Sequence, residues 1–155
     1  MLKLIIGNRA YSSWSFRGWL ACKQSGEEFE ELVVPMFDED WEKRRDGDEF
    51  APSLGKVPIL WDGEIVVWDS MAIIEFLSDR YGSALYWPED EDARAVARSM
   101  AAEMHSGFAN LRRDLAMNVR KSFSPKQLRT ETGASFFQLH PVAESPPGSS
   151  SILRI

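Results

Sequence analysis

The sequence is poor in cysteine, in histidine and in long apolar runs. Its single cysteine, Cys22, excludes an intramolecular disulfide and a metal site built from several cysteines. The two histidines, His105 and His140, lack the spacing of zinc ligands. The N-terminal apolar run is too short for a signal peptide, and no run is long enough to span a bilayer. We therefore predict a cytoplasmic protein with no bound metal and no membrane partner.

Positive charge is also scarce. The chain has 18 Lys and Arg against 24 Asp and Glu, which gives a formal net charge of -6 at pH 7. A nucleic acid or an anionic membrane would require a basic patch, so we predict no nucleic-acid partner. The length of 155 residues, with 44% hydrophobic and 27% charged residues, is typical of one globular domain and a fraction of another.

Strand and helix signals alternate over residues 1–82. Short Val- and Ile-rich runs predict strands, and helically spaced apolar residues between Ser or Asp starts and Gly stops predict helices. Asp62-Gly63 between two such runs predicts a two-residue hairpin turn. The predicted elements are strands at 2–8, 27–36, 57–61 and 64–68, and helices at 12–26, 38–50 and 69–82. This β-α-β-α-β-β-α order predicts an α/β, thioredoxin-like domain.

The rest of the chain changes character twice. Residues 88–121 predict one long helix of a partial all-α domain, with acids at its start and an apolar stripe that includes Val96 and Met100. Residues 122–155 hold four of the eight prolines and no sustained period, which predicts an irregular, disordered tail. We expect a truncated chain whose tail, from about Ser124, is read in another frame or replaced; an intact frame shared with longer relatives would contradict this.

A proline at the start of a strand is the first candidate for a binding feature. Pro58 keeps Val57 extended and leaves its main-chain groups free, as an extended peptide ligand requires. A cis proline there would be a deliberate feature beside a ligand. The alternative is that Pro58 merely begins an edge strand in the trans form.

Two polar helix starts provide the other candidates. Asp69 and Ser70 could hold the ammonium and carboxylate of an amino acid at a helix N-terminus, or Asp69 could simply cap the helix. In the run Ser12-Ser13-Trp14-Ser15, a hydroxyl aided by the helix dipole could donate to a thiolate and lower its pKa. The alternative is that one serine is a cap and the others are solvated.

Together these motifs resemble a known family. Residues 1 to about 82 resemble the glutathione-binding domain of the glutathione transferases, because KVPIL followed by WDSMAIIEFL is similar to that family's proline turn and acid-serine motif. SSWSFRGWLACKQSG resembles the serine-type active-site segment of the theta, zeta and related bacterial branches. Trp14 stands where the zeta branch has a cysteine, which argues against zeta-type isomerase chemistry. Residues 94–112 resemble the first helix of the family's helical domain.

The resemblance implies a binding site for glutathione, the cradle, which is formed by Lys56, Val57, Pro58, Asp69 and Ser70. Val57 would pair its backbone with the cysteinyl part, with Pro58 holding the turn. Ser70 and Asp69 would take the γ-glutamyl carboxylate and ammonium, and Lys56 would reach the glycine carboxylate.

The resemblance also implies an activity. Ser12, or alternatively Ser13, would stabilise the thiolate, which would attack a small electrophile that the sequence does not identify. A homodimer is implied as well. The alternatives are a non-catalytic glutathione-binding fragment without the electrophile pocket and a glutathione-dependent isomerase or dehalogenase. A thiol-disulfide oxidoreductase is disfavoured because the chain has no CxxC pair.

Overall fold

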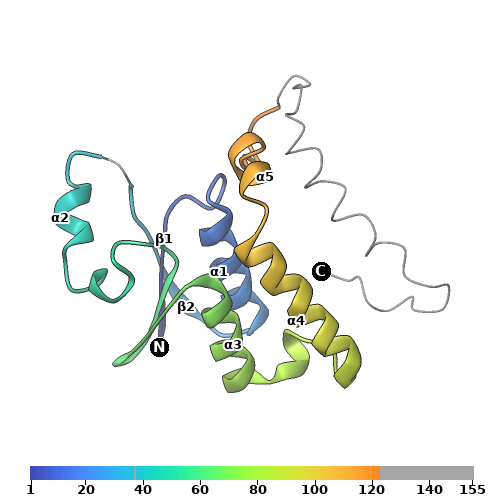
Figure 1. The fold of residues 1–155 in the computed structure, drawn as a ribbon. Helices are drawn as coiled ribbons and strands as arrows, with labels where there is room; N and C mark the ends of the chain where they lie inside the picture. The colour runs from blue at the N-terminus through green and yellow to red at the C-terminus, as the bar shows by residue number, and fades with distance from the viewer. Residues whose placement is uncertain (37, 123–155) are drawn as a thin grey trace. The chain divides into compact units, whose positions relative to one another are not determined.

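The computed structural model of the protein describes residues 1–36 and 38–122. The chain divides into two compact units, Met1–Trp87 and Pro88–Ile155, shown in Figure 1. The predicted tail at 122–155 lies, apart from Ser122, outside the described residues. Within the described residues, no helix combines the length and the apolar character needed to cross a membrane.

The first unit is a four-stranded sheet with helices on both faces. The strands follow the order β2-β1-β3-β4, in which β1 is parallel to β2 and antiparallel to β3, and β3 and β4 form an antiparallel hairpin. In Figure 1, α1 and α3 lie on one side of the sheet and α2 on the other. The elements are β1 (Leu2–Ile6), α1 (Ser13–Gln24), β2 (Phe29–Val33), α2 (Trp41–Arg45), β3 (Ile59–Asp62), β4 (Ile65–Trp68) and α3 (Ser70–Tyr81). The predicted thioredoxin-like order is confirmed.

The alternation of side chains along the strands explains why both faces are covered. Leu4 and Leu60 are fully buried on the face that packs against α1 and α3, whereas Ile5 and Ile59 are fully buried on the opposite face. The 3-10 turn Ala51–Ser53 and α2 cover this second face, where Trp41 and Phe50 complete a separate apolar cluster. A strand segment buried on both faces must be apolar, which accounts for the buried residues Leu4, Ile5 and Ile6 of β1, whereas Lys3 is only half-buried.

The hairpin differs from its prediction by one residue. Asp62 pairs with Ile65 as the last rung of the ladder, so the two loop residues are Gly63 and Glu64 and not Asp62 and Gly63. Gly63 has φ +59°, a conformation that glycine adopts without steric cost. The Asp-Gly signal therefore identified the hairpin but not its register.

The single long helix predicted over 88–121 is wrong. The structure has α4 (Glu91–Ser106), then a break, then the short helix α5 (Ala109–Asp114). Phe108 has φ +60°, which ends the right-handed helical path. The Arg112 guanidinium donates to the carbonyl oxygens of Met104 and Gly107, which satisfies groups that the interrupted helix leaves open.

The break also divides the predicted apolar stripe. Val96 and Met100 lie on α4 and are 54% and 37% exposed. Leu111 lies on α5 and Leu115 follows it, so these two residues do not continue the same helical face. The stripe is therefore shorter than the periodicity of the sequence indicates.

From two acidic groups of the first unit, the buried Cys22 thiol and the half-buried Tyr86 hydroxyl, we predict a loss of stability at alkaline pH. Burial raises the pKa of the Cys22 thiol from 9.0 to about 12, opposed by the charge of Lys23. Burial and then the nearby Cys22 raise the pKa of Tyr86 from 10.0 to about 12, and the Tyr86 hydroxyl donates to the Ala21 carbonyl at 2.9 Å. The folded state keeps these protons while the unfolded state releases them, so the free energy of unfolding should fall as pH rises from about 9 to 12.

Denaturant unfolding at a series of pH values measures this effect. In Cys22→Ala, the decline between pH 9 and 12 should be shallower than in the unaltered chain, because only Tyr86 then titrates with a raised pKa. Equal slopes for the two chains would contradict the prediction.

Candidate functional site

The strand register brings three chain segments to one edge of the sheet. Ile5 of β1 lies opposite Ile59 of β3, and Ile59 in turn lies opposite Trp68 of β4. Because both pairs are antiparallel, the end of β1, the start of β3 and the end of β4 share an edge. The Val57-Pro58 turn directly precedes β3, α3 begins two residues after β4, and α1 begins after the loop of residues 7–12 that follows β1. The structure therefore brings the three predicted site segments together.

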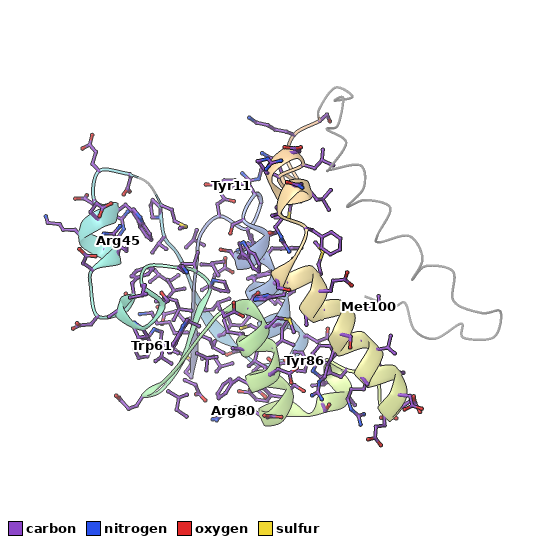
Figure 2. All side chains as sticks on the ribbon, in the orientation of Figure 1. Tyr11, Arg45, Trp61, Arg80, Tyr86 and Met100 are labelled. Carbon is purple, nitrogen blue, oxygen red and sulfur yellow. The ribbon has the colours of Figure 1, made fainter. Side chains whose placement is uncertain are left out.

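Figure 2 shows the two ends of the first unit. Tyr11, the residue before Ser12, lies at one end of the unit, and Arg80 near the end of α3 lies at the other. Arg80 forms an ion pair of 2.8 Å with Asp62 beside the hairpin loop. The charged pair is thus far from the α1 N-terminus and takes no part in the candidate site.

The start of α1 is built from a tight set of hydroxyl contacts. Ser12 is the N-cap, and its Oγ accepts the Ser15 N–H at 3.3 Å. The Ser12 and Ser15 hydroxyl oxygens are 3.0 Å apart, and Ser15 Oγ also accepts the Gly7 N–H at 3.0 Å. Ser13 is the first residue of α1, and its half-buried hydroxyl has no hydrogen-bond partner among residues 1–36 and 38–122. The two predicted serines therefore differ: one hydroxyl is anchored and the other is not.

The proline turn packs against α1. The Val57-Pro58 bond is cis, and Pro58 is buried. A Cβ atom placed on Gly18 of α1 would lie 2.8 Å from Pro58 Cβ and 2.9 Å from its Cγ, so the helix backbone approaches the ring closely. In the described part of the chain, the backbone N–H and C=O of Val57 take part in no hydrogen bond. Val57 thus offers a free donor and acceptor at this edge.

The start of α3 combines an unusual backbone with a buried hydroxyl. Asp69 has φ +77°, rare for a residue with a side chain, and its carboxylate accepts the N–H groups of Met71 at 2.8 Å and Ala72 at 3.4 Å. Ser70 is 1% exposed, and its Oγ has no hydrogen-bond partner among the described residues. A buried polar atom without a partner is costly unless something else satisfies it. Asp69 is therefore a cap as well as a candidate ligand, and the Ser70 hydroxyl remains available.

Lys56 precedes the proline turn and is exposed. Its N–H donates to the Ser53 carbonyl at 3.2 Å, and its ammonium forms no ion pair with the residues that the structure describes. A hollow of about 480 Å³ is lined by Arg45, Asp46, Ala51 and Leu54, which come shortly before Lys56 in the sequence. None of the predicted residues lines this hollow, so the candidate site is the edge of the sheet and not the hollow.

Sequence reasoning missed a cluster that holds the loop before Ser12. The Glu31 carboxylate of β2 accepts the Trp19 Nε1–H at 2.9 Å and forms an ion pair with Arg9. The Arg9 guanidinium lies 4.9 Å from the centre of the Trp19 ring. This cluster ties the loop between β1 and α1 to the neighbouring strand. Arg9, Trp19 and Glu31 are far apart in sequence and form no motif, so only the fold reveals them.

Ser15, the last residue of the serine run, is a further residue at the start of α1. Its spacing of three from Ser12 is that of a capping pair, which is the one sequence signal for its position. Among the described residues, no group of three or more His, Cys, Asp or Glu side chains is arranged to hold a metal ion.

Comparisons with known proteins identify relatives of this unit. Residues 11–80 match the family model described as glutathione S-transferase, N-terminal domain. A dichloromethane dehalogenase of Methylorubrum extorquens is 39% identical over 59 residues, which are 38% of this chain and 20% of the relative. The glutathione S-transferase Z2 of Arabidopsis thaliana is 32% identical over 104 residues, which are 64% of this chain and 46% of the relative.

A solved structure is similar as well. The glutathione transferase homologue from Burkholderia, with bound glutathione, has a TM-score of 0.56 and 25% identity to this chain, over 71% of this chain and 56% of its own. The chain thus spans less than half of the two curated relatives and little more than half of the solved one. The matched residues 11–80 lie within the first unit and contain all the predicted site residues. Residues 11–80 therefore form a glutathione S-transferase N-terminal domain, within the thioredoxin-like first unit.

Proposed function

We propose that the protein binds glutathione at the edge of the sheet and transfers its thiolate to a small electrophile. The observation that carries this proposal is the buried Ser70 hydroxyl, which has no partner among the described residues and lies at the same edge of the sheet as the free backbone of Val57. A ligand with a carboxylate and an extended peptide backbone satisfies both. The bound glutathione in the Burkholderia homologue supports the choice of ligand.

The cradle assigns one group of glutathione to each feature. The γ-glutamyl carboxylate accepts the Ser70 hydroxyl at the N-terminus of α3, where the helix dipole favours an anion. Asp69 pairs with the ammonium of the same end. The backbone of Val57 pairs with the cysteinyl part, and Pro58 holds the turn against Gly18. Lys56 reaches the glycine carboxylate.

The reaction depends on a hydroxyl at the start of α1. The thiol of glutathione loses its proton to solvent, and the Ser12 hydroxyl donates a hydrogen bond to the resulting thiolate, aided by the dipole of α1. The sulfur then uses its electron pair to form a bond with an electrophilic carbon of the second substrate, and the leaving group departs with its bonding pair. Ser13 is the alternative donor because its hydroxyl has no partner among the described residues.

A second candidate function uses the same first step. The sequence identity of 39% over 59 residues to a dichloromethane dehalogenase favours a haloalkane as electrophile. In that case a carbon–halogen bond breaks as the sulfur–carbon bond forms. An isomerase remains less favoured because Trp14 replaces the zeta cysteine, although a relative of the Z type is 32% identical. Turnover of an aromatic halide, of a haloalkane or of neither separates a transferase, a dehalogenase and a non-catalytic glutathione-binding protein.

The proposal also includes a cellular location and an oligomeric state. A cytoplasmic location suits a protein that needs reduced glutathione, because that compartment keeps the pool reduced. The homodimer expected from the family is supported by Val96 and Met100 on α4, which are 54% and 37% exposed. A monomeric mass in sedimentation experiments would contradict the dimer without affecting the glutathione site.

Calorimetric titration with reduced glutathione tests the proposal. The unaltered chain should show saturable one-site binding. Ser70→Ala should bind at least about tenfold more weakly, because one charge-assisted hydrogen bond contributes roughly 1.5–3 kcal/mol. The same substitution should not lower the stability, because the hydroxyl has no partner in the described structure that could be lost.

Ser78→Ala is the matched control. Ser78 lies on the same helix, is 2% exposed, and also has an Oγ without a partner among the described residues, but it lies two turns from the site. Its replacement should leave glutathione binding unchanged. Equal binding by Ser70→Ala and the unaltered chain, or no binding by either folded protein, would refute the cradle.

A further inference from the structure

A buried serine lies next to the Ser12 hydroxyl. Ser15 is 0% exposed, one turn into α1, and is the most deeply buried residue of the serine run. Its Oγ accepts the Gly7 N–H at 3.0 Å and lies 3.0 Å from Ser12 Oγ. It therefore connects the end of β1 to the hydroxyl proposed to face the thiolate.

The number of hydrogen bonds that each hydroxyl can donate and accept limits how Ser12 and Ser15 bond to each other. A serine hydroxyl has one hydrogen to donate and two lone pairs to accept with. The two oxygens are 3.0 Å apart, so either hydroxyl can donate to the other. If the Ser12 O–H donates to Ser15 Oγ, that oxygen accepts both this hydrogen and the Gly7 N–H. Both acceptor positions of Ser15 are then used and its own hydrogen is directed at neither of these partners. This arrangement is incomplete for a fully buried hydroxyl.

Reversing one hydrogen bond completes the set. When Ser15 O–H donates to Ser12 Oγ, Ser15 still accepts the Gly7 N–H, and Ser12 Oγ accepts both the Ser15 N–H and the Ser15 O–H. The Ser12 hydrogen is then free to point to an acceptor outside the protein. The hydroxyl hydrogens of Ser12 and Ser15 then both form hydrogen bonds only if an anion or another acceptor lies next to Ser12.

Ser15 is shielded from solvent, since it is 0% exposed. A Cβ atom on Gly7 would lie 2.8 Å from Met36 Sδ and 3.6 Å from Ser15 Oγ, so the space between Gly7 and Ser15 is closely packed. In such a site, where solvent is excluded, a hydrogen bond that ends on one hydroxyl strengthens the bond that this hydroxyl donates.

We propose that Ser15 is a positioning residue, which turns the Ser12 hydrogen toward the sulfur of bound glutathione and strengthens that hydrogen bond. The inference rests on the proposed function and deepens it. Ser15 touches neither the ligand nor the reacting atoms, and it acts through Ser12. No covalent step is added, because only the direction of one hydrogen bond changes when the ligand binds.

The test compares two ligands in Ser15→Ala. The ultraviolet absorbance of bound glutathione thiolate, followed against pH, should show the thiol pKa about one unit higher than in the unaltered chain, a tenfold loss of thiolate for one weakened hydrogen bond. Binding of S-methylglutathione, which cannot form a thiolate, should change by less than about twofold. Damage to the cradle as a whole would weaken both ligands.

Two further variants keep the test decisive. Ser15→Cys keeps the shape of the side chain but donates a weaker hydrogen bond, so it should show a smaller shift of the same sign even if Ser15→Ala does not fold. Ser78→Ala, another buried serine, should show no shift. An unchanged thiol pKa in the Ser15 variants, or equal weakening of both ligands, overturns the role of Ser15. Absence of a thiolate signal in the unaltered chain overturns the proposed function itself, and is seen before any substitution is made.

Discussion

Replacing Ser12 with alanine should lower the turnover of glutathione with an electrophile by roughly a hundredfold, as loss of one preorganised donor to a reacting anion does elsewhere. The Ser12 hydroxyl is proposed to hold the thiolate at the N-terminus of α1, where the dipole adds to its effect. The thiol pKa of bound glutathione should rise in the same variant. Steady-state kinetics and the absorbance of the bound thiolate measure the two effects.

Ser12 is also the N-cap of α1, so the cap and the donor must be separated. Loss of the cap alone should cost about 1 kcal/mol of stability in Ser12→Ala. Ser12→Asp keeps an acceptor for the Ser15 N–H but offers no hydrogen and carries a negative charge, so it should fold normally and remain inactive. Ser12→Thr keeps the hydroxyl and should retain activity.

Ser13→Ala decides between the two serines. With Ser12 as donor, this substitution should change turnover by no more than a few-fold, because the Ser13 hydroxyl anchors nothing in the described structure. A collapse of turnover in Ser13→Ala, with activity kept in Ser12→Ala, would transfer the role to Ser13.

Gly18→Ala should destabilise the first unit by about 1–3 kcal/mol and weaken glutathione binding. The new Cβ would lie 2.8 Å from Pro58 Cβ and 2.9 Å from Pro58 Cγ, closer than two carbon atoms can approach, so α1 or the proline turn must shift. Val57, whose backbone is proposed to pair with glutathione, is the residue before this proline. Denaturant unfolding and calorimetry measure the two consequences.

The sign of the change in the free energy of unfolding distinguishes the contact with Pro58 from the effect of helix propensity. Within a helix, alanine is more favourable than glycine by about 1 kcal/mol, so propensity alone predicts that Gly18→Ala stabilises the protein. Leu20→Ala, on the same helix at a residue that is 45% exposed, is the control and should have little effect on glutathione binding. A more stable Gly18→Ala variant with unchanged binding would show that the contact with Pro58 is unimportant.

Local signals predicted the elements of the first unit well. Serine and aspartate at the starts of α1 and α3, glycine at the end of α3, and the apolar runs of the strands all depend on neighbours in sequence. The same signals failed at the hairpin and in the second unit. Gly63 and Glu64 form the loop because the ladder includes Asp62, and α4 ends because Gly107 and then Phe108 leave the helical region.

The sequence by itself determined the order of strands and helices, the caps of α1 and α3, and the candidate roles of Ser12, Asp69 and Ser70, because each depends on groups only a few residues apart. Only the tertiary structure decided which of these groups meet. The register of β1, β3 and β4 brings three chain ends to one edge, and the packing of Gly18 on Pro58 locks the turn to α1. Burial of Ser15 against Gly7 was likewise invisible in the sequence, because solvent exclusion depends on contacts between segments and not on the order of residues.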